Sequence, residues 1–124
     1  MAVKFEQPRP DVLVCIYASP FVMEDIIRTQ KEIVSRRKNT DMLYMISDLR
    51  NIKLTFSQIV ESMGQSLDGK YGYRVGDPGV EIIIVTDISM NKQIAEFYRQ
   101  DQYGGVRMPV FNSMDEANSY IFSR

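Results

Sequence analysis

Three short, continuous apolar runs place the tightest limit on the fold of this chain. They occupy residues 12–17, 42–46 and 82–85, and the first and last are rich in β-branched residues. Such runs are typical of strands that are covered on both faces, as in a parallel sheet. We therefore expect helices on both sides of a sheet built from these strands.

Two weaker strand signals lie near the ends of the chain. Residues 107–111 form a shorter strand pattern that includes Pro109, which lacks an N–H group and fits best at the end of a strand or the edge of a sheet. Residues 3–7 form a candidate leading strand that would run antiparallel to its neighbour. The sequence does not decide whether this leading segment joins the sheet.

The segments between the strand runs have the period of amphipathic helices. Ser19 is the expected N-cap of the first helix. Thr55 and Gln58 form a capping-box pattern before a second helix, and Ser113 and Glu116 form another before the last. A further helical pattern lies between the last two strand runs.

Strand and helix therefore alternate along the chain, a pattern that favours an α/β fold with right-handed crossovers. We predict a four- to five-stranded, mostly parallel but mixed sheet with about four helices. The length of 124 residues is near that of an average domain, so residues 1–124 are expected to form a single domain.

Composition narrows the choice of partners. Lys and Arg together number 15 against 16 Asp and Glu, so the net charge of −1 gives no global attraction to nucleic acid or to an anionic membrane. The single cysteine, Cys15, favours a reducing compartment, and no apolar run approaches the ~18 residues that span a bilayer. We expect a cytoplasmic protein without nucleic-acid binding or membrane insertion.

Histidine is absent from the chain. Its absence removes the usual general base, the usual partner of a nucleophilic serine or cysteine, and the commonest zinc ligand. The sequence therefore favours a non-enzymatic domain, and we expect neither a metal nor a cofactor.

Polar residues at the ends of the predicted strands form a candidate ligand or acidic site. Ser19, Asp48 and Asp87 each follow a strand run, and the carboxyl ends of parallel strands are where α/β sheets bind ligands. The competing interpretation is that such aspartates form turns or cap helices, which single aspartates after strands usually do.

The loop at residues 68–79 is rich in glycine and is expected to be mobile or to project as an arm. Its tyrosines, together with the edges of a small sheet, are candidate surfaces for a homodimer.

Two motifs resemble the STAS domain, the fold of bacterial anti-sigma-factor antagonists. Residues 48–52 read DLRNI, similar to the D-L-x-N-V that closes a strand in this family, and residues 3–56 follow the family's order of elements. The tail ends in a short strand and a capped helix in which Glu116 and Ala117 match a frequent E-A pair. The resemblance implies a STAS-like α/β fold and a regulatory role in protein–protein interaction.

In that family a serine at the start of the next helix is phosphorylated by a partner kinase. Counted from Asp48, this position falls on Ser57, with Phe56 in place of the family's acid and Gln58 in place of its glycine. The resemblance therefore makes Ser57 and Thr55 the candidate sites of phosphorylation or partner contact. In the alternative interpretation Thr55 only caps the helix, Ser57 is an exposed residue of its first turn, and Phe56 packs.

Two hypotheses follow. The chain is either a STAS-like regulatory module that binds an unidentified protein partner, or a small ligand-binding or enzymatic α/β domain that uses the strand ends near Asp48 and Asp87.

Overall fold

The computed structural model describes residues 3–123 as an α/β structure, which confirms the predicted fold class. The strands are β1 (Lys4–Arg9), β2 (Val12–Ile16), β3 (Leu43–Asp48), β4 (Val80–Val85) and β5 (Val110–Phe111). The helices are α1 (Met23–Arg36), α2 (Phe56–Asp68), α3 (Ser89–Arg99) and α4 (Met114–Phe122). The sheet order is β1-β2-β3-β4-β5, in which β1 pairs antiparallel with β2 and the other pairs are parallel.

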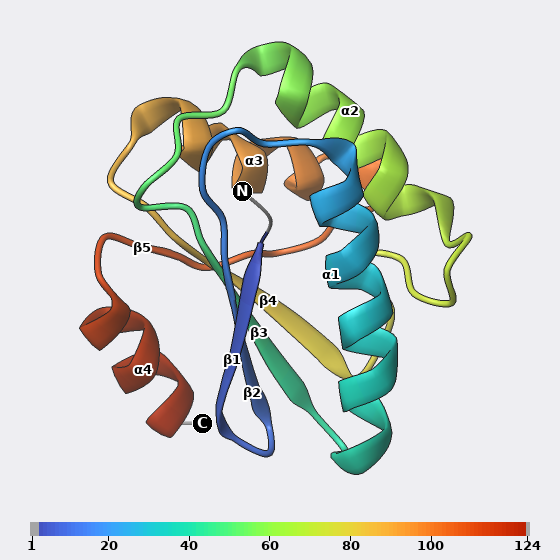
Figure 1. Ribbon diagram of the computed structural model, residues 1–124, viewed down its shortest axis with the longest axis vertical. Helices are drawn as coiled ribbons and strands as arrows, with labels where there is room; N and C mark the ends of the chain where they lie inside the picture. The colour runs from blue at the N-terminus through green and yellow to red at the C-terminus, as the bar shows by residue number, and fades with distance from the viewer. Residues whose placement is uncertain (1–2, 124) are drawn as a thin grey trace.

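The helices lie on both sides of the sheet, with α1, α2 and α3 on one side and α4 on the other (Figure 1). Two hydrophobic clusters reflect these layers. The larger one joins one face of the sheet to residues of α1, α2 and α3, and the smaller one joins the opposite face to Ala117 and Ile121 of α4. Residues 3–123 contain no helix long and apolar enough to cross a membrane.

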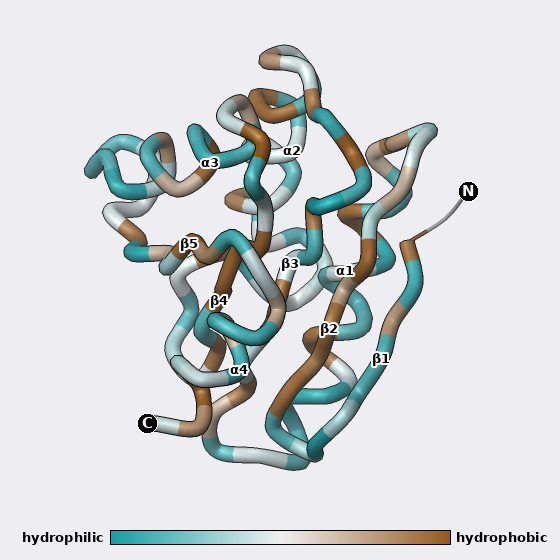
Figure 2. The backbone as a smooth tube through the Cα atoms, turned by 90° about the vertical axis from the view of Figure 1, so that its left-hand side faces the viewer, coloured by the Kyte–Doolittle hydropathy of each residue, from teal (hydrophilic) through white to brown (hydrophobic). Residues whose placement is uncertain are grey.

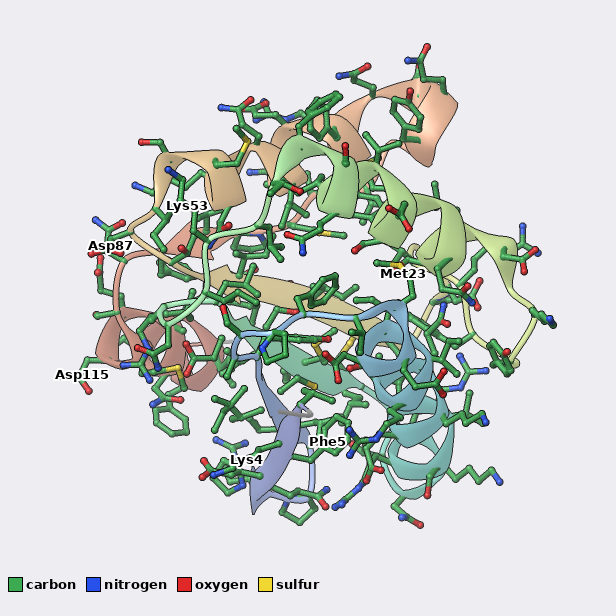
Figure 3. All side chains as sticks on the ribbon, turned by 45° about the horizontal axis from the view of Figure 1, so that its top comes forward. Lys4, Phe5, Met23, Lys53, Asp87 and Asp115 are labelled. Atoms are coloured by element: carbon green, nitrogen blue, oxygen red, sulfur yellow. The ribbon has the colours of Figure 1, made fainter. Side chains whose placement is uncertain are left out.

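The leading segment joins the sheet as the edge strand β1. Lys4 and Phe5 point to opposite sides of this strand (Figure 3), and Phe5 packs against the larger cluster under the guanidinium of Arg28. Figure 2 shows that β2 and most of β4 are hydrophobic whereas β1 is mostly hydrophilic. This contrast is expected for interior strands beside an edge strand.

The structure corrects the predicted start of the first helix. The N-cap of α1 is Val22, not Ser19, and Asp25 supplies the capping carboxylate. Its oxygens accept hydrogen bonds from the backbone N–H groups of Val22 at 3.2 Å and Val3 at 3.1 Å. The side chain of Asp25 thus satisfies a free helix N–H and also ties the start of the chain to α1. The other two predicted caps are confirmed, since Thr55 and Ser113 are N-caps.

The glycine-rich loop folds back against α1, so the expectation of a projecting arm is wrong. Gly69 ends α2 with φ of 74°, a left-handed conformation that reverses the chain. Arg37 of the segment after α1 then donates to the carbonyl of Gly72 at 2.8 Å, and the Val75 N–H donates to the carbonyl of Ser66 at 3.0 Å. These bonds place the loop's second tyrosine, Tyr73, in the core.

A buried asparagine on α3 holds the junction between β3 and α2. The Asn91 side chain has no exposed surface, and its Nδ2 donates to the carbonyls of Leu49 at 3.1 Å and Ile52 at 2.7 Å. Its Oδ1 accepts from the N–H of Leu54 at 3.1 Å. Because no strand or helix pairs these backbone groups, Asn91 fixes the path of the chain into α2.

Candidate functional site

The end of β3 carries an aspartate that is already paired. Asp48 is only 2% exposed, and it accepts from Nε of Arg50 at 2.9 Å and from Nη2 of Arg50 at 2.8 Å. The carboxylate in turn raises the pKa of Arg50. This two-bond geometry is that of a charge-assisted pair, and it leaves Asp48 with little capacity for a ligand.

Ser19 and Asp87 are exposed, and neither takes part in the pair of Asp48 and Arg50. Asp87 projects at the rim of the molecule between β4 and α3 (Figure 3), and Ser19 lies in the segment before α1. Within residues 3–123, no hydrogen bond or ion pair joins either residue to Asp48, and no group of three or more acidic, Cys or His side chains could hold a metal ion. The three predicted residues follow strand ends that are in register at one edge of the sheet, but no hydrogen bond or ion pair within residues 3–123 joins them.

The start of α2 presents the residues that the family resemblance singles out. Thr55 accepts from the Gln58 N–H at 3.1 Å, and the Gln58 side chain accepts from the Thr55 N–H at 2.9 Å, which completes the capping box. Ser57 is exposed. Its neighbour Phe56 is 57% exposed and makes an edge contact with Phe97 of α3 at 5.9 Å between ring centroids.

A cavity of about 90 Å³ lies between the sheet and the three helices on its larger-cluster side. Its lining comes from β3 and β4, from α1, α2 and α3, from Tyr17 just after β2, and from the folded-back loop at residues 73–75 and other connecting segments. Apart from hydroxyl groups and the single amide of Gln30, the lining is apolar, and it includes no charged side chain. A space of this size can hold several waters or a small organic molecule. We call it the core cavity.

One polar pair on the wall of the core cavity is fully satisfied. The hydroxyl of Thr29 donates to the carbonyl of Asp25 at 2.9 Å, so its only hydrogen is used. The hydroxyl of Tyr17, 2.7 Å from Thr29 Oγ1, must then be the donor in that contact. Burial raises the pKa of Tyr17, which keeps this proton in place.

Two other polar atoms of the lining have no partner within residues 3–123. They are Oε1 of Gln30 and the hydroxyl of Tyr73, whose residues are 3% and 1% exposed. The orientation of the Gln30 amide is fixed, because Nε2 donates at 3.0 Å to the backbone carbonyl of Gln65, which can only accept. Leaving such a buried group unpaired costs about 1–3 kcal/mol, so the two atoms are open positions for a bound molecule.

Sequence reasoning did not identify Gln30 or Tyr73. A signal for Gln30 was present, because it lies four residues after Ile26 and three before Ile33, on the apolar stripe of α1. A polar residue on a buried stripe indicates a specific partner. No local signal distinguishes Tyr73 from Tyr71 in the glycine-rich loop, since their separation depends on how the loop folds.

Comparisons of this chain with protein-family models, with curated proteins and with solved structures gave no match.

Proposed function

We propose that this chain is a binding domain for a small, largely apolar molecule, which occupies the core cavity. One observation carries the proposal: Oε1 of Gln30 and the hydroxyl of Tyr73 are buried without partners in the wall of an apolar cavity. Ligand sites typically combine an apolar lining with a few convergent polar groups. The core cavity has such an apolar lining, and two of its lining residues carry a polar atom without a partner within residues 3–123.

The chemistry of the lining supports binding rather than catalysis. The core cavity is lined by no carboxylate, lysine or cysteine, and the chain has no histidine. The remaining ionisable groups are tyrosines, and burial raises the pKa of Tyr98 to about 12 and that of Tyr73 further. These hydroxyls therefore stay protonated near neutral pH, where they can hydrogen-bond but not act as bases.

Thermal unfolding in the presence of cyclopentanol tests the proposal. A ligand that binds only the folded chain raises the melting temperature in a saturable way. We expect such a rise for cyclopentanol, with a dissociation constant of about 10 μM to 1 mM, the range that a few well-packed heavy atoms allow. A melting temperature that only falls with added cyclopentanol would contradict the proposal.

A second function is favoured by the exposed start of α2, namely that of a STAS-like regulatory module. Phe56 and Val60 are 57% and 49% exposed one helical turn apart, and Ser57 lies beside Phe56 in the first turn. A phosphate on Ser57 would meet free backbone N–H groups and the positive end of the helix dipole. On this view, phosphorylation would change the charge of a surface that binds a protein partner.

The variant Ser57→Asp tests this second function. An acid in the first turn of α2 is expected to change the free energy of unfolding by no more than about 1 kcal/mol, because the helix dipole favours it. Binding of a partner, captured with the wild-type chain from the source cell, should change severalfold, whereas the neutral control Ser57→Asn should bind as wild type does. Equal binding by all three chains, or no captured partner, would count against it.

A further inference from the structure

On the basis of the proposed cavity function, we infer that the ligand is a neutral molecule whose apolar body carries a hydrogen-bond-donating head of the hydroxyl type. Its head would be recognised by Oε1 of Gln30 and the hydroxyl of Tyr73. The inference follows from the donor and acceptor capacity that each side chain has left.

Gln30 requires a donor from the ligand. Its Nε2 is used by the carbonyl of Gln65, and the free atom, Oε1, can only accept. A ketone, an ether or a hydrocarbon would leave this oxygen unpaired. A buried acceptor without a partner is unfavourable, because it has lost the hydrogen bonds that it would make to water when exposed to solvent. A hydroxyl group supplies the missing hydrogen.

Tyr73 is compatible with the same head. Its hydroxyl has no partner and can donate or accept. The ring is held by its surroundings, since the guanidinium of Arg37 lies 5.7 Å from its centroid and the segment is tied to α1 through Gly72. The hydroxyl therefore has a fixed position from which it can donate to a ligand oxygen, and a hydroxyl is the simplest group that serves both Gln30 and Tyr73.

The lining of the core cavity does not suit a charged ligand. No charged side chain lines the core cavity, and the nearest buried carboxylate on α1, that of Asp25, already accepts from Val3 and Val22 and lies 3.9 Å from Arg28. Arg37 itself is used by Gly72 and by Asp77, the latter at 4.0 Å. A carboxylate or ammonium in the core cavity would thus lose its hydration without gaining a counter-charge.

A series of ligands that differ only in the head group tests the inference. The probes are cyclopentanol, cyclopentane, cyclopentylammonium and cyclopentanecarboxylate, and the dissociation constants come from titrations followed by methyl resonances. Wild type should bind cyclopentanol about tenfold more tightly than cyclopentane, which is the size of one net hydrogen bond. The two ions should bind at least tenfold more weakly than the alcohol.

Two tyrosine variants separate recognition from packing. Tyr73→Phe should reduce the preference for cyclopentanol over cyclopentane but not abolish it, because Oε1 of Gln30 still accepts from the alcohol. It should not lower the melting temperature of the ligand-free chain, because the deleted hydroxyl has no partner within residues 3–123. Tyr120→Phe in α4 is the control: it deletes a hydroxyl that donates to the carboxylate of Glu81 at 2.9 Å, on the opposite side of the sheet from the core cavity, so it should lower the melting temperature and keep the preference.

Each outcome decides between the two proposals. If cyclopentane binds as tightly as cyclopentanol, the head-group inference is overturned while cavity binding stands. If Tyr73→Phe keeps the full preference, the role given to Tyr73 in recognising the head is overturned. If an ion binds as well as the alcohol, the inference of a neutral ligand is overturned. If no probe binds and the core cavity holds only water, the proposed function fails as well.

Discussion

Replacing Asn91 with alanine is expected to lower the free energy of unfolding by about 3–5 kcal/mol, a large part of the total for a domain of this size. The substitution leaves the carbonyl of Ile52 and the N–H of Leu54 without their partner, and leaves the carbonyl of Leu49 with only the hydroxyl of Thr86 at 3.4 Å. Leu49, Ile52 and Leu54 flank or form the connection into α2. Because each unpaired buried group adds its own penalty, the loss far exceeds that of one hydrogen bond.

Urea unfolding followed by circular dichroism measures this loss. Asn91→Asp should be nearly as destabilising, because it keeps the acceptor for Leu54 but turns a carboxylate toward two carbonyl oxygens. Asn118→Ala in α4 is a matched control at a helical position, and its unfolding free energy should stay within about 0.5 kcal/mol of wild type. A loss below about 1 kcal/mol for Asn91→Ala would show that the junction does not depend on this side chain.

The variant Ser62→Leu is expected to weaken binding of cyclopentanol by about 100-fold or more, because a leucine at this position occupies the space of the ligand. Ser62 is a partly buried residue of α2 that lines the core cavity. Its hydroxyl donates only to the carbonyl of Gln58 in its own helix, at 2.7 Å, so little is lost with it. Added apolar atoms in an apolar cavity should leave the melting temperature equal to that of wild type or raise it.

The combination of lost binding with retained stability identifies a blocked cavity rather than a damaged fold. Ser119→Leu makes the same substitution at an exposed position of α4, on the opposite side of the sheet, and should bind cyclopentanol as wild type does. If Ser62→Leu binds normally, the ligand does not occupy the core cavity. If both variants lose binding equally, the effect is not local.

The sequence predicts those elements of the fold that depend on interactions between residues close together in the chain. The β-branched run at residues 12–17 forms a strand over residues 12–16, and the Thr55–Gln58 pair caps a helix through bonds that span only three residues. Ser19 was misassigned as a cap because a hydroxyl before a helical pattern is a common signal. Asp25, placed three residues inside the helix, fills that role by reaching back to Val22.

The candidate site was not predictable, because it depends on which side chains long-range packing brings together. The lining of the core cavity combines Tyr17, Gln30, Ser62 and Tyr73, which are far apart in the chain and occur just after a strand, in two helices and in a loop. Asp48, the most conspicuous candidate in the sequence, proved to be paired with Arg50 two residues away. Only the polar residue at position 30 on an apolar stripe indicated the site in advance.

A methyl-resolved NMR titration with cyclopentanol is the most direct test of cavity binding. The methyl groups of Ile33 and Ile84 belong to the core cavity, whereas those of Ile83 and Ile121 lie in the cluster on the opposite face of the sheet and serve as an internal control. We expect saturable shifts at Ile33 and Ile84, with Ile83 and Ile121 unchanged. Shifts that grow linearly with concentration and are equal in both groups would contradict the account.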